Sequence, residues 1–319
     1  MEILSSKTIE DKILKNYFEY QYYFVELQSK FLSGLYSKYQ NIDNGNLVLY
    51  YEKQTHQNIL RKKDYDFNFN ISLEKFWENH SESNPTRKSL IKIAKDTLLP
   101  KETVRRKILE LLNKKVLNKK NRSVEWLPNE QHKQSYNLFV NEEIEDIIKL
   151  LNYICKKLDY NISKEELEKE IKEKFSFYWF HYLGAQLEYL KIWSKQLNDL
   201  EFALILMKIV HVFTRKVKEE NISHKKIFDN PSLLKNFISA NVSATSISEI
   251  TKIPRATCVR KLGILVKLKV ISQDPITKRY YVLPEAVSKD LISRKITQKV
   301  VTTFSNFFFI CIRAIKAKK

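Results

Sequence analysis

The sequence predicts a mainly α-helical protein with an internal duplication, in which two helix-and-hairpin units are each preceded by a hairpin of long helices. Three observations predict this fold class. A basic stretch at residues 100–117 recurs at 254–271, and an aromatic-rich helical pattern at 9–39 recurs at 163–193. After each basic stretch, two short strand-like runs joined by a polar turn end at a Leu-Pro pair, Leu127-Pro128 or Leu283-Pro284.

The basic repeat is the strongest of these signals because its two copies align without a gap. The copies share a proline, a threonine and an Arg-Lys pair, followed by a leucine, a lysine and a valine. These pairs are Pro100 and Pro254, Thr103 and Thr257, Arg106-Lys107 and Arg260-Lys261, Leu111 and Leu265, Lys115 and Lys269, and Val116 and Val270.

Each copy is predicted to form an amphipathic helix, and proline suits its first turn. Apolar residues at helical spacing form one face. They are Val104, Ile108, Leu111 and Leu112 in the first copy, and Cys258, Leu262, Leu265 and Val266 in the second. The opposite face carries Lys101, Thr103, Arg105, Arg106 and Lys107, or Arg255, Thr257, Arg260 and Lys261. A buried stripe behind a basic face is typical of a helix that lies in the major groove of DNA.

The neighbouring segments complete a known pattern. Residues 72–80 and 89–96 predict two helices before the first basic helix, and residues 232–240 and 246–253 predict two before the second. The order of helix, helix, basic helix and hairpin resembles the winged helix-turn-helix domains of MarR-type and Crp/FNR-type regulators, over about a third of the chain. The resemblance implies that the basic helix reads the major groove and that the hairpin, or wing, reaches a minor groove or its phosphates.

Five segments follow from this pattern. They are an aromatic-rich helical hairpin (1–70), a first winged helix-turn-helix (71–131), a second helical hairpin (136–222), a second winged helix-turn-helix (228–286) and a basic C-terminal helix (287–319). Residues 129–135 read as a polar linker before a helix at 141–158. Ser-x-x-Glu patterns predict capping boxes at Ser163 and Ser246. The C-terminal helix has no counterpart in the first half; we expect it to pack on the core, and dimer or phosphate contacts are left open.

Charge and composition point to the same class of partner. The formal net charge is +19 and the sequence pI is about 9.5, which favours nucleic acid over an anionic membrane surface as a partner. Codon bias in an AT-rich genome is an alternative explanation for part of the excess of lysine. The cysteines, Cys155, Cys258 and Cys311, have no metal or redox spacing and fit a reducing cytosol. The most apolar runs, 202–212 and 304–312, are shorter than the ~20 residues of a membrane span.

Individual DNA contacts are predicted from side-chain chemistry. Arg106 and Arg260 come first, because arginine can bind guanine O6 and N7 together, although a phosphate contact is an equal alternative. Thr103 and Thr257 either contact DNA or stabilise the first helical turn. Arg105 has no counterpart, since Val259 takes its place, so it is the candidate for a contact in one half-site. The wings offer Lys119, Lys120, Arg122, Lys278 and Arg279, for which a solvated turn is the alternative.

The sequence therefore predicts a cytoplasmic, nucleoid-associated protein that binds double-stranded DNA in a sequence-specific manner, most simply a transcription regulator. A replication-initiator-like protein and a winged-helix protein-interaction module are the alternatives. Without a Gly-rich phosphate loop, metal spacing or nucleophile motif, no enzyme activity, cofactor or metal is expected. Aromatic residues at helical spacing are expected in the core, with an effector pocket or a single-strand stacking platform as alternatives. A homodimer and a small-molecule effector are left open.

Overall fold

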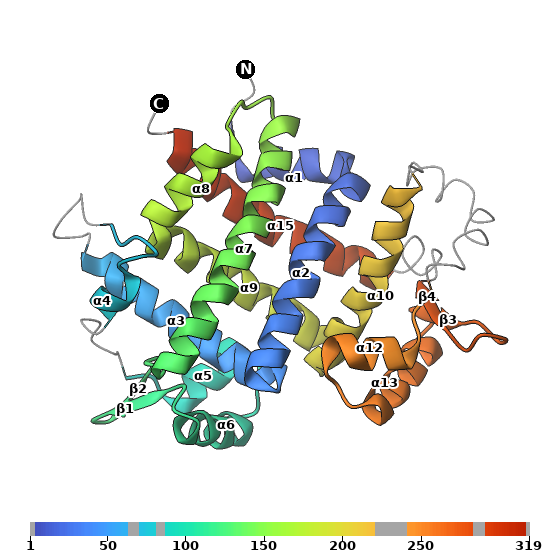
Figure 1. The fold of residues 1–319 in the computed structure, drawn as a ribbon, viewed down its shortest axis with the longest axis horizontal. Coiled ribbons are helices and arrows are strands. Elements are labelled where there is room, and N and C mark those ends of the chain that lie inside the picture. The colour runs from blue at the N-terminus through green and yellow to red at the C-terminus, as the bar shows by residue number, and fades with distance from the viewer. Residues whose placement is uncertain (1–3, 63–69, 81–86, 221–240, 283–290, 317–319) are drawn as a thin grey trace.

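The computed structural model describes residues 4–62, 70–80, 87–220, 241–282 and 291–316, apart from the side chains of Phe18 and of residues 291–294 (Figure 1). The described chain is mainly helical, as the sequence predicts, and contains two small antiparallel sheets. The predicted helix at 232–240 lies outside the described residues.

The first half of the chain begins with three helices and continues into a helix-and-hairpin unit. In order, its elements are α1 (Ser6–Lys15), α2 (Tyr17–Tyr39), α3 (Ile42–Arg61), α4 (Phe76–His80), α5 (Leu90–Thr97), α6 (Lys101–Asn113), β1 (Asn118–Lys120), β2 (Ser123–Glu125) and α7 (Glu130–Lys157). The short helix α4 begins four residues later than predicted. We call α5, α6, β1 and β2 the first helix–hairpin unit.

The second half repeats this order. Its elements are α8 (Lys164–Glu173), α9 (Phe175–Leu197), α10 (Leu200–Glu219), α12 (Ala244–Thr251), α13 (Arg255–Lys267), β3 (Ile271–Gln273), β4 (Tyr280–Val282) and α15 (Leu291–Lys316). We call α12, α13, β3 and β4 the second helix–hairpin unit.

Matching helices have equal lengths. Helices α1 and α8 each have 10 residues, α2 and α9 have 23, and α3 and α10 have 20. Helices α5 and α12 have 8 residues each, and α6 and α13 have 13. The first three helices of the second half start 158 residues after their counterparts, as from Tyr17 to Phe175.

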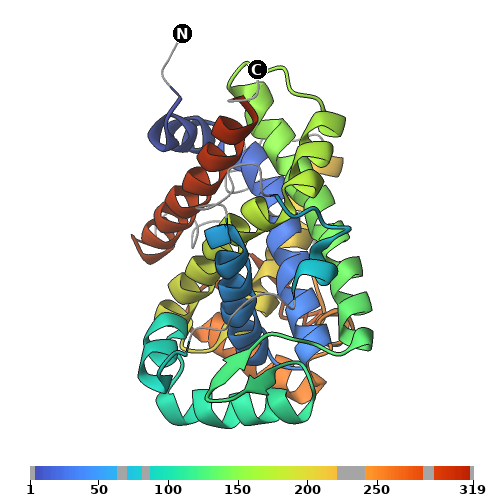
Figure 2. The ribbon, with the colours of Figure 1, turned by 90° about the vertical axis from the view of Figure 1, so that its left-hand side faces the viewer.

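The two halves interlock through their long helices. Helix α3 packs on α9, and α10 packs on α2. Helix α7 packs on α2 and α8, while α15 packs on α9 and α1, which are the matching helices. The C-terminal helix therefore packs on the core, as expected. The prediction that it has no counterpart is wrong, because α15 occupies the place that α7 occupies in the first half (Figures 1 and 2).

Four details of the helical parts correct the sequence prediction. The continuous helices expected at 9–39 and 163–193 are each interrupted once, at Asn16 (φ −116°) and at Lys174 (φ −111°). The expected linker at 129–135 is the start of α7, because Asn129 caps the helix by accepting the N–H of His132 at 3.0 Å. The capping box at Ser163 is confirmed. The one at Ser246 is wrong, because Ser243 is the N-cap of α12.

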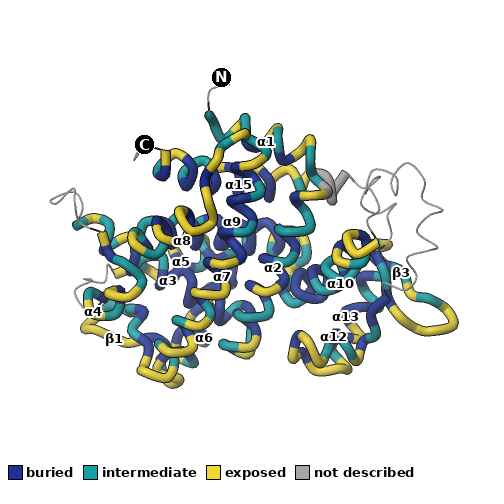
Figure 3. The backbone as a smooth tube through the Cα atoms, turned by 45° about the horizontal axis from the view of Figure 1, so that its top comes forward, coloured by how far each residue is buried: buried dark blue, intermediate teal, exposed yellow. Residues whose placement is uncertain are grey.

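The aromatic helices form the core, as predicted. Tyr20, Phe24 and Phe31 of α2 are buried, and so are Tyr182 and Tyr189 of α9. The rings pack edge to face between helices; Phe31 and Tyr182 have centroids 6.3 Å apart and Phe24 and Tyr189 6.1 Å. Buried backbone runs through the centre of the molecule in Figure 3, and the exposed residues gather on the outer turns. Across the described ranges, no helix is long and apolar enough to cross a membrane.

Candidate nucleic-acid interface

The two helices of each helix–hairpin unit are joined by a tight turn. Ser89 caps α5 by accepting the N–H of Lys92 at 3.2 Å, and Ser243 caps α12 by accepting that of Ser246 at 3.0 Å. Leu98 then ends α5 in the left-handed conformation (φ 58°), and Lys252 does so for α12 (φ 63°). Pro100 and Pro254 precede α6 and α13. This turn fixes the direction of the basic helix relative to the helix before it.

The apolar face of each basic helix is buried, as predicted. Val104, Ile108 and Leu111 of α6 are buried, and so are Cys258, Leu262 and Leu265 of α13; Leu112 and Val266 are partly buried. Helix α6 packs on α3, and α13 packs on α10. Because the core takes up this face, the other face of each helix is left to the solvent.

Most of the predicted contact residues lie on that solvent-exposed side. Exposed side chains on the helices are those of Lys101, Arg105, Arg106, Arg255 and Arg260, and those on the hairpins are Lys119, Lys120, Arg122, Lys278 and Arg279. Thr103 and Thr257 are half-buried. Helices α5, α6, α12 and α13 lie in the lower part of the molecule in Figure 1, whereas the hairpin β3–β4 lies at its right-hand side. The structure therefore brings α6 and α13, which carry the two basic faces, to the same side of the protein.

Lys107 and Lys261 are exceptions, and the expectation that they lie on the exposed basic face is wrong. Lys107 is only 7% exposed, and its Nζ donates to Oδ1 of Asn41 at 3.0 Å and to Oδ1 of Asn44 at 3.2 Å. Lys261 is 2% exposed; its ammonium contacts Asp199 and lies 3.1 Å from Oε2 of Glu201.

The physical reason is that each lysine stem crosses the buried side of its helix and reaches the start of a core helix. Asn41 is the N-cap of α3 and Asp199 is the N-cap of α10, so each capping side chain also accepts from a lysine. Burial lowers the pKa of Lys107, which the carboxylate of Asp43, 3.9 Å away, partly offsets. These lysines position the basic helices and are not available to a ligand at the exposed face.

Arg105 is the exposed residue that most clearly distinguishes the two helices. Its Nε donates to Oε2 of Glu102 at 2.9 Å, within the exposed part of α6. The matching position on α13 is Val259, which is exposed and apolar. An exposed ion pair of this spacing contributes only about 0.2–0.5 kcal/mol, so the guanidinium is free to change partner.

The hairpins differ in their tips. In the first, Lys119 pairs with Val124 in the strand register, and Asn121 takes up the left-handed conformation (φ 55°) at the turn. In the second, Oδ1 of Asp274 accepts the N–H groups of Ile276 at 3.0 Å and Thr277 at 2.6 Å, which holds a longer turn. The predicted pairs of short strands are confirmed in both.

A basic cleft adds residues that the sequence analysis missed. Its volume is about 630 Å³, and Arg87, Lys88, Lys101 and Arg122 are among its lining residues, with Ser89 at the start of α5. The cleft thus joins the segment before α5, the first turn of α6 and the first hairpin. Arg87 and Lys88 gave no signal in the repeat, because they precede the predicted helix and have no basic counterparts in the second copy. Four cations around one cleft suit a phosphate-bearing partner.

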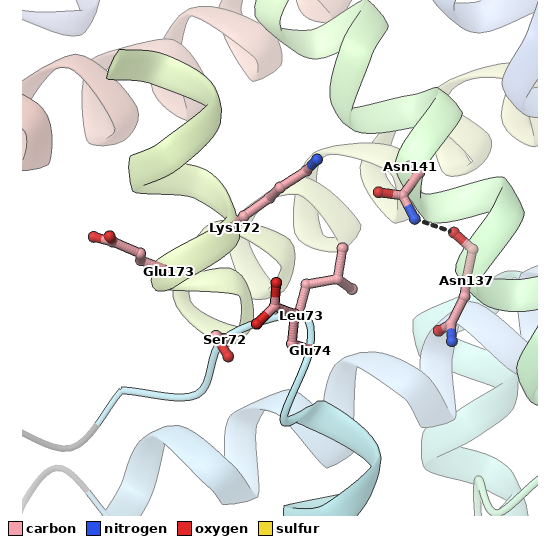
Figure 4. Close-up of a pocket in the computed structure, with 7 residues that line it drawn as sticks. All are labelled: Ser72, Leu73, Glu74, Asn137, Asn141, Lys172 and Glu173. Carbon is pink, nitrogen blue, oxygen red and sulfur yellow. Dashed lines mark hydrogen bonds between the residues drawn. The ribbon is translucent and has the colours of Figure 1, made fainter. Parts of the chain in front are cut away.

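A second cleft, between the segment before α4 and helices α7 and α8, has no such arrangement (Figure 4). Asn141 donates to the backbone oxygen of Asn137 at 2.8 Å, and Lys172 donates to Glu168 at 2.6 Å. Glu173 points away from the other lining residues. Within the described ranges, no group of three or more His, Cys, Asp or Glu side chains is placed to hold a metal ion.

Comparisons with protein-family models, with curated proteins and with solved structures find no match for this chain.

Proposed function

We propose that this chain is a sequence-specific double-stranded-DNA-binding protein, in particular a transcription regulator that contacts two half-sites with two winged-helix units on one polypeptide. The observation that carries the proposal is the placement of two helices, α6 and α13, each with its apolar face buried and exposed Lys and Arg side chains, at the same edge of the molecule. A duplex presents two rows of phosphates to such an edge, and the excess of 19 positive charges favours association.

In this proposal the two halves arose by duplication of one unit. The support is the repeated sequence, the equal lengths of the matching helices and the reciprocal packing of α3 on α9 and of α10 on α2. DNA-binding dimers place two recognition helices about 34 Å apart, one turn of the duplex. Two units on one polypeptide can contact two half-sites in the same way. Unlike the subunits of a homodimer, their contact residues can differ, as Arg105 and Val259 do. Association with the nucleoid is part of the same proposal.

The roles of the exposed residues follow from their positions. Arg106 and Arg260 would contact base edges or phosphates in the major groove, with Thr103 and Thr257 beside them. Lys101 and Arg255 begin their helices, and Lys101 also lines the basic cleft, which suits a phosphate. Lys119, Lys120, Arg122, Lys278 and Arg279 on the hairpins would reach a neighbouring minor groove or its phosphates. Lys107 and Lys261 are assigned a positioning role only.

The salt dependence of binding to duplex DNA tests the electrostatic part of the proposal. Fluorescence anisotropy of the full chain with a duplex of about 30 base pairs should give a log-affinity that falls steeply with log salt, by about 0.9 per phosphate contacted. Binding that is weak and insensitive to salt would instead favour a protein-interaction role for the same units.

Selection from a random-sequence duplex pool tests the specific part. The wild-type chain should enrich a bipartite sequence. Arg106→Ala should relax one half of the enriched sequence and Arg260→Ala the other half, because each replaces a residue of one basic helix. Lys169→Ala is the control, since this exposed lysine lies on α8, at the opposite edge of the molecule. If either single arginine variant weakened the sequence preference in both halves, the proposal that each basic helix contacts one half-site would be contradicted.

A further inference from the structure

A cavity of about 290 Å³ lies between the helical core and the second helix–hairpin unit. Its walls come from six elements: α2, α9, α10, α13, β4 and α15. Most of the lining side chains are apolar, among them Phe24, Leu206, Met207, Leu265, Val282 and Val300. None of the described residues that line it carries a charge at neutral pH.

Three polar groups on the cavity wall are buried without a hydrogen bond of acceptable geometry. They are the hydroxyl of Tyr20, the hydroxyl of Tyr189 and the indole N–H of Trp193, on side chains that are 1%, 1% and 9% exposed. Tyr189 and Trp193 are neighbours, with ring centroids 6.2 Å apart. Burial raises the pKa of Tyr20 well above its usual value, so its hydroxyl stays protonated and remains a donor. Leaving such donors without an acceptor costs stability, so each needs an explanation.

The matching positions in the other half of the chain show what satisfies such groups. Tyr178 matches Tyr20, and its buried hydroxyl donates to Oε1 of Glu170 at 3.1 Å. At the position that matches Glu170, α1 carries Lys12. Tyr189 and Trp193 match Phe31 and Leu35, which have no polar group to satisfy. Compared with its matching positions, the cavity wall has therefore gained the donors of Tyr189 and Trp193 and lost the acceptor for Tyr20.

The matching region of the first half also contains an internal acceptor. The carboxyl of Glu52 accepts from the hydroxyl of Tyr136 and from the indole N–H of Trp179, both at 2.6 Å. Burial raises the pKa of Glu52 to about 7, and these hydrogen bonds and the nearby Lys38 offset part of the rise. In the second half, Val210 stands at the position of Glu52, and Gln196 at that of Lys38; both line the cavity. An ionisable acceptor and its neighbouring lysine are thus replaced by side chains that do not titrate.

We propose that this cavity binds a small, flat, neutral aromatic molecule that carries a carbonyl or similar hydrogen-bond acceptor. The aromatic and aliphatic walls select a flat apolar body, and the volume limits it to a compact molecule of one or two fused rings. The hydroxyls of Tyr20 and Tyr189, which have no acceptor, select an acceptor on the ligand; the indole N–H of Trp193 is directed at Tyr189. Without a cation on the described wall, an anionic ligand would lose its hydration without compensation, which selects against a carboxylate.

An occupant of the cavity would touch both the core and the second basic helix. Leu265 of α13 and Leu268, the residue that caps its C-terminus, line the cavity, and Lys261 on the same helix contacts Asp199, the N-cap of α10. A ligand that changes the position of α13 would therefore change the affinity for DNA. This coupling rests on the proposed function, whereas binding to the cavity does not.

Three naphthalene probes of similar shape test the proposal with the full-length chain. Titration calorimetry should show that 2-acetylnaphthalene binds at least about tenfold more tightly than 2-ethylnaphthalene, which lacks an acceptor, and than 2-naphthoate, which is charged; tenfold corresponds to 1.4 kcal/mol. Equal affinity for the three probes, or no binding of 2-acetylnaphthalene at millimolar concentration, would overturn it.

Two variants locate the probe. Tyr20→Phe removes one donor and leaves the packing intact, so the affinity for 2-acetylnaphthalene should fall about tenfold, again 1.4 kcal/mol, without loss of folding. Tyr178→Phe, at the matching position in the second half, is the control and should leave the affinity unchanged. Val210→Phe fills the cavity and should abolish binding; Leu206→Phe replaces it if that variant does not fold. Unchanged affinity in both Tyr20→Phe and the cavity-filling variant would place the probe elsewhere and refute the site.

DNA affinity with and without saturating 2-acetylnaphthalene then tests the coupling separately. A shift that disappears in Tyr20→Phe supports it. Probe binding with unchanged DNA affinity rejects the coupling and leaves the site in place, while a chain that binds the probe but no DNA rejects the proposed function alone.

Discussion

The Nζ atom of Lys107 lies 3.0 Å from Oδ1 of Asn41, the residue that caps the N-terminus of α3. Lys261 makes the matching contact with Asp199, the cap of α10. In each half, a buried ammonium therefore ties a basic helix to the start of a long core helix. Because α3 and α10 pack on helices of the other half, the same contacts fix the two basic faces relative to each other.

We predict that Lys261→Met lowers the free energy of unfolding by about 1–3 kcal/mol, because the carboxylates of Asp199 and Glu201 lose their common cation while they remain partly hydrated. Urea denaturation at neutral pH measures the change. Lys267→Met, at an exposed position near the end of the same helix, should alter stability by less than about 0.5 kcal/mol. Equal effects of the two substitutions would show that the buried ammonium does not anchor α13.

The same lysine separates positioning from DNA contact. If Lys261 does not touch a phosphate, Lys261→Met should leave the slope of log-affinity against log salt as it is in the wild type. Arg260→Ala should reduce that slope by about 1 if Arg260 contacts a phosphate. Anisotropy titrations at several salt concentrations compare the two variants. A reduced slope in Lys261→Met would show that Lys261 contacts a phosphate after all.

Arg105 and Val259 predict which half of the bound sequence is read differently. Arg105→Val makes α6 resemble α13 at this position, so the sequence preference should be lost in one half-site only. Release of Arg105 from Glu102 costs about 0.2–0.5 kcal/mol, which is small beside the 1–3 kcal/mol of a good bidentate contact to a base. Selection from a random pool reads out the change, and the reverse substitution, Val259→Arg, should add a preference in the other half-site.

The amphipathic basic helices, the hairpins and the aromatic core follow from patterns that lie within short stretches of sequence. Val104 and Cys258 are buried because the apolar spacing of a helix requires a partner surface. Lys107 has no such signal: locally it belongs to a basic run, and its partner Asn41 is 66 residues away. The helix start at Asn129 was missed because a polar first turn resembles a linker.

Two further features could not be predicted from the sequence: the matching positions of α7 and α15, and the cavity. The two helices share a packing position and no readable alignment, so only the contacts of α7 with α2 and of α15 with α9 reveal it. The donors around the cavity become informative only when the hydroxyl of Tyr20 is seen without the acceptor that Tyr178 has in Glu170.

The first hairpin supplies a prediction about charge alone. Replacing Lys119, Lys120 and Arg122 together by Ala should lower the affinity for every duplex sequence by a similar factor and reduce the salt slope by about 2–3, because wing contacts to phosphates carry no direct sequence information. The three residues are exposed, so the melting temperature should not change. Replacing three exposed lysines of α7 and α8, namely Lys156, Lys164 and Lys169, removes the same charge and should have a much smaller effect, because α8 lies at the opposite edge of the molecule (Figure 1).

Glu143 predicts a dependence of stability on pH. Its carboxyl is buried on α7, where it accepts a hydrogen bond from the hydroxyl of Tyr182, and burial raises its pKa to about 8. In the unfolded chain the group titrates near pH 4.3, so between these values the folded state binds more protons than the unfolded state. The free energy of unfolding should therefore fall as pH rises from about 5 to 8, with a slope of up to about 1.4 kcal/mol per pH unit from this residue.

The Glu143→Gln variant isolates this contribution, because a neutral amide can still accept from Tyr182 and does not titrate. Urea denaturation between pH 5 and pH 9 should show that the variant loses less stability than the wild type as pH rises, and that it is the more stable of the two above pH 8. Glu142→Gln changes an exposed neighbour on the same helix and should follow the wild-type curve. Parallel curves for wild type and Glu143→Gln would mean that the buried carboxyl is ionised throughout this range, as a closer approach of the Lys30 ammonium, which already contacts Asp146 at 2.8 Å, would bring about.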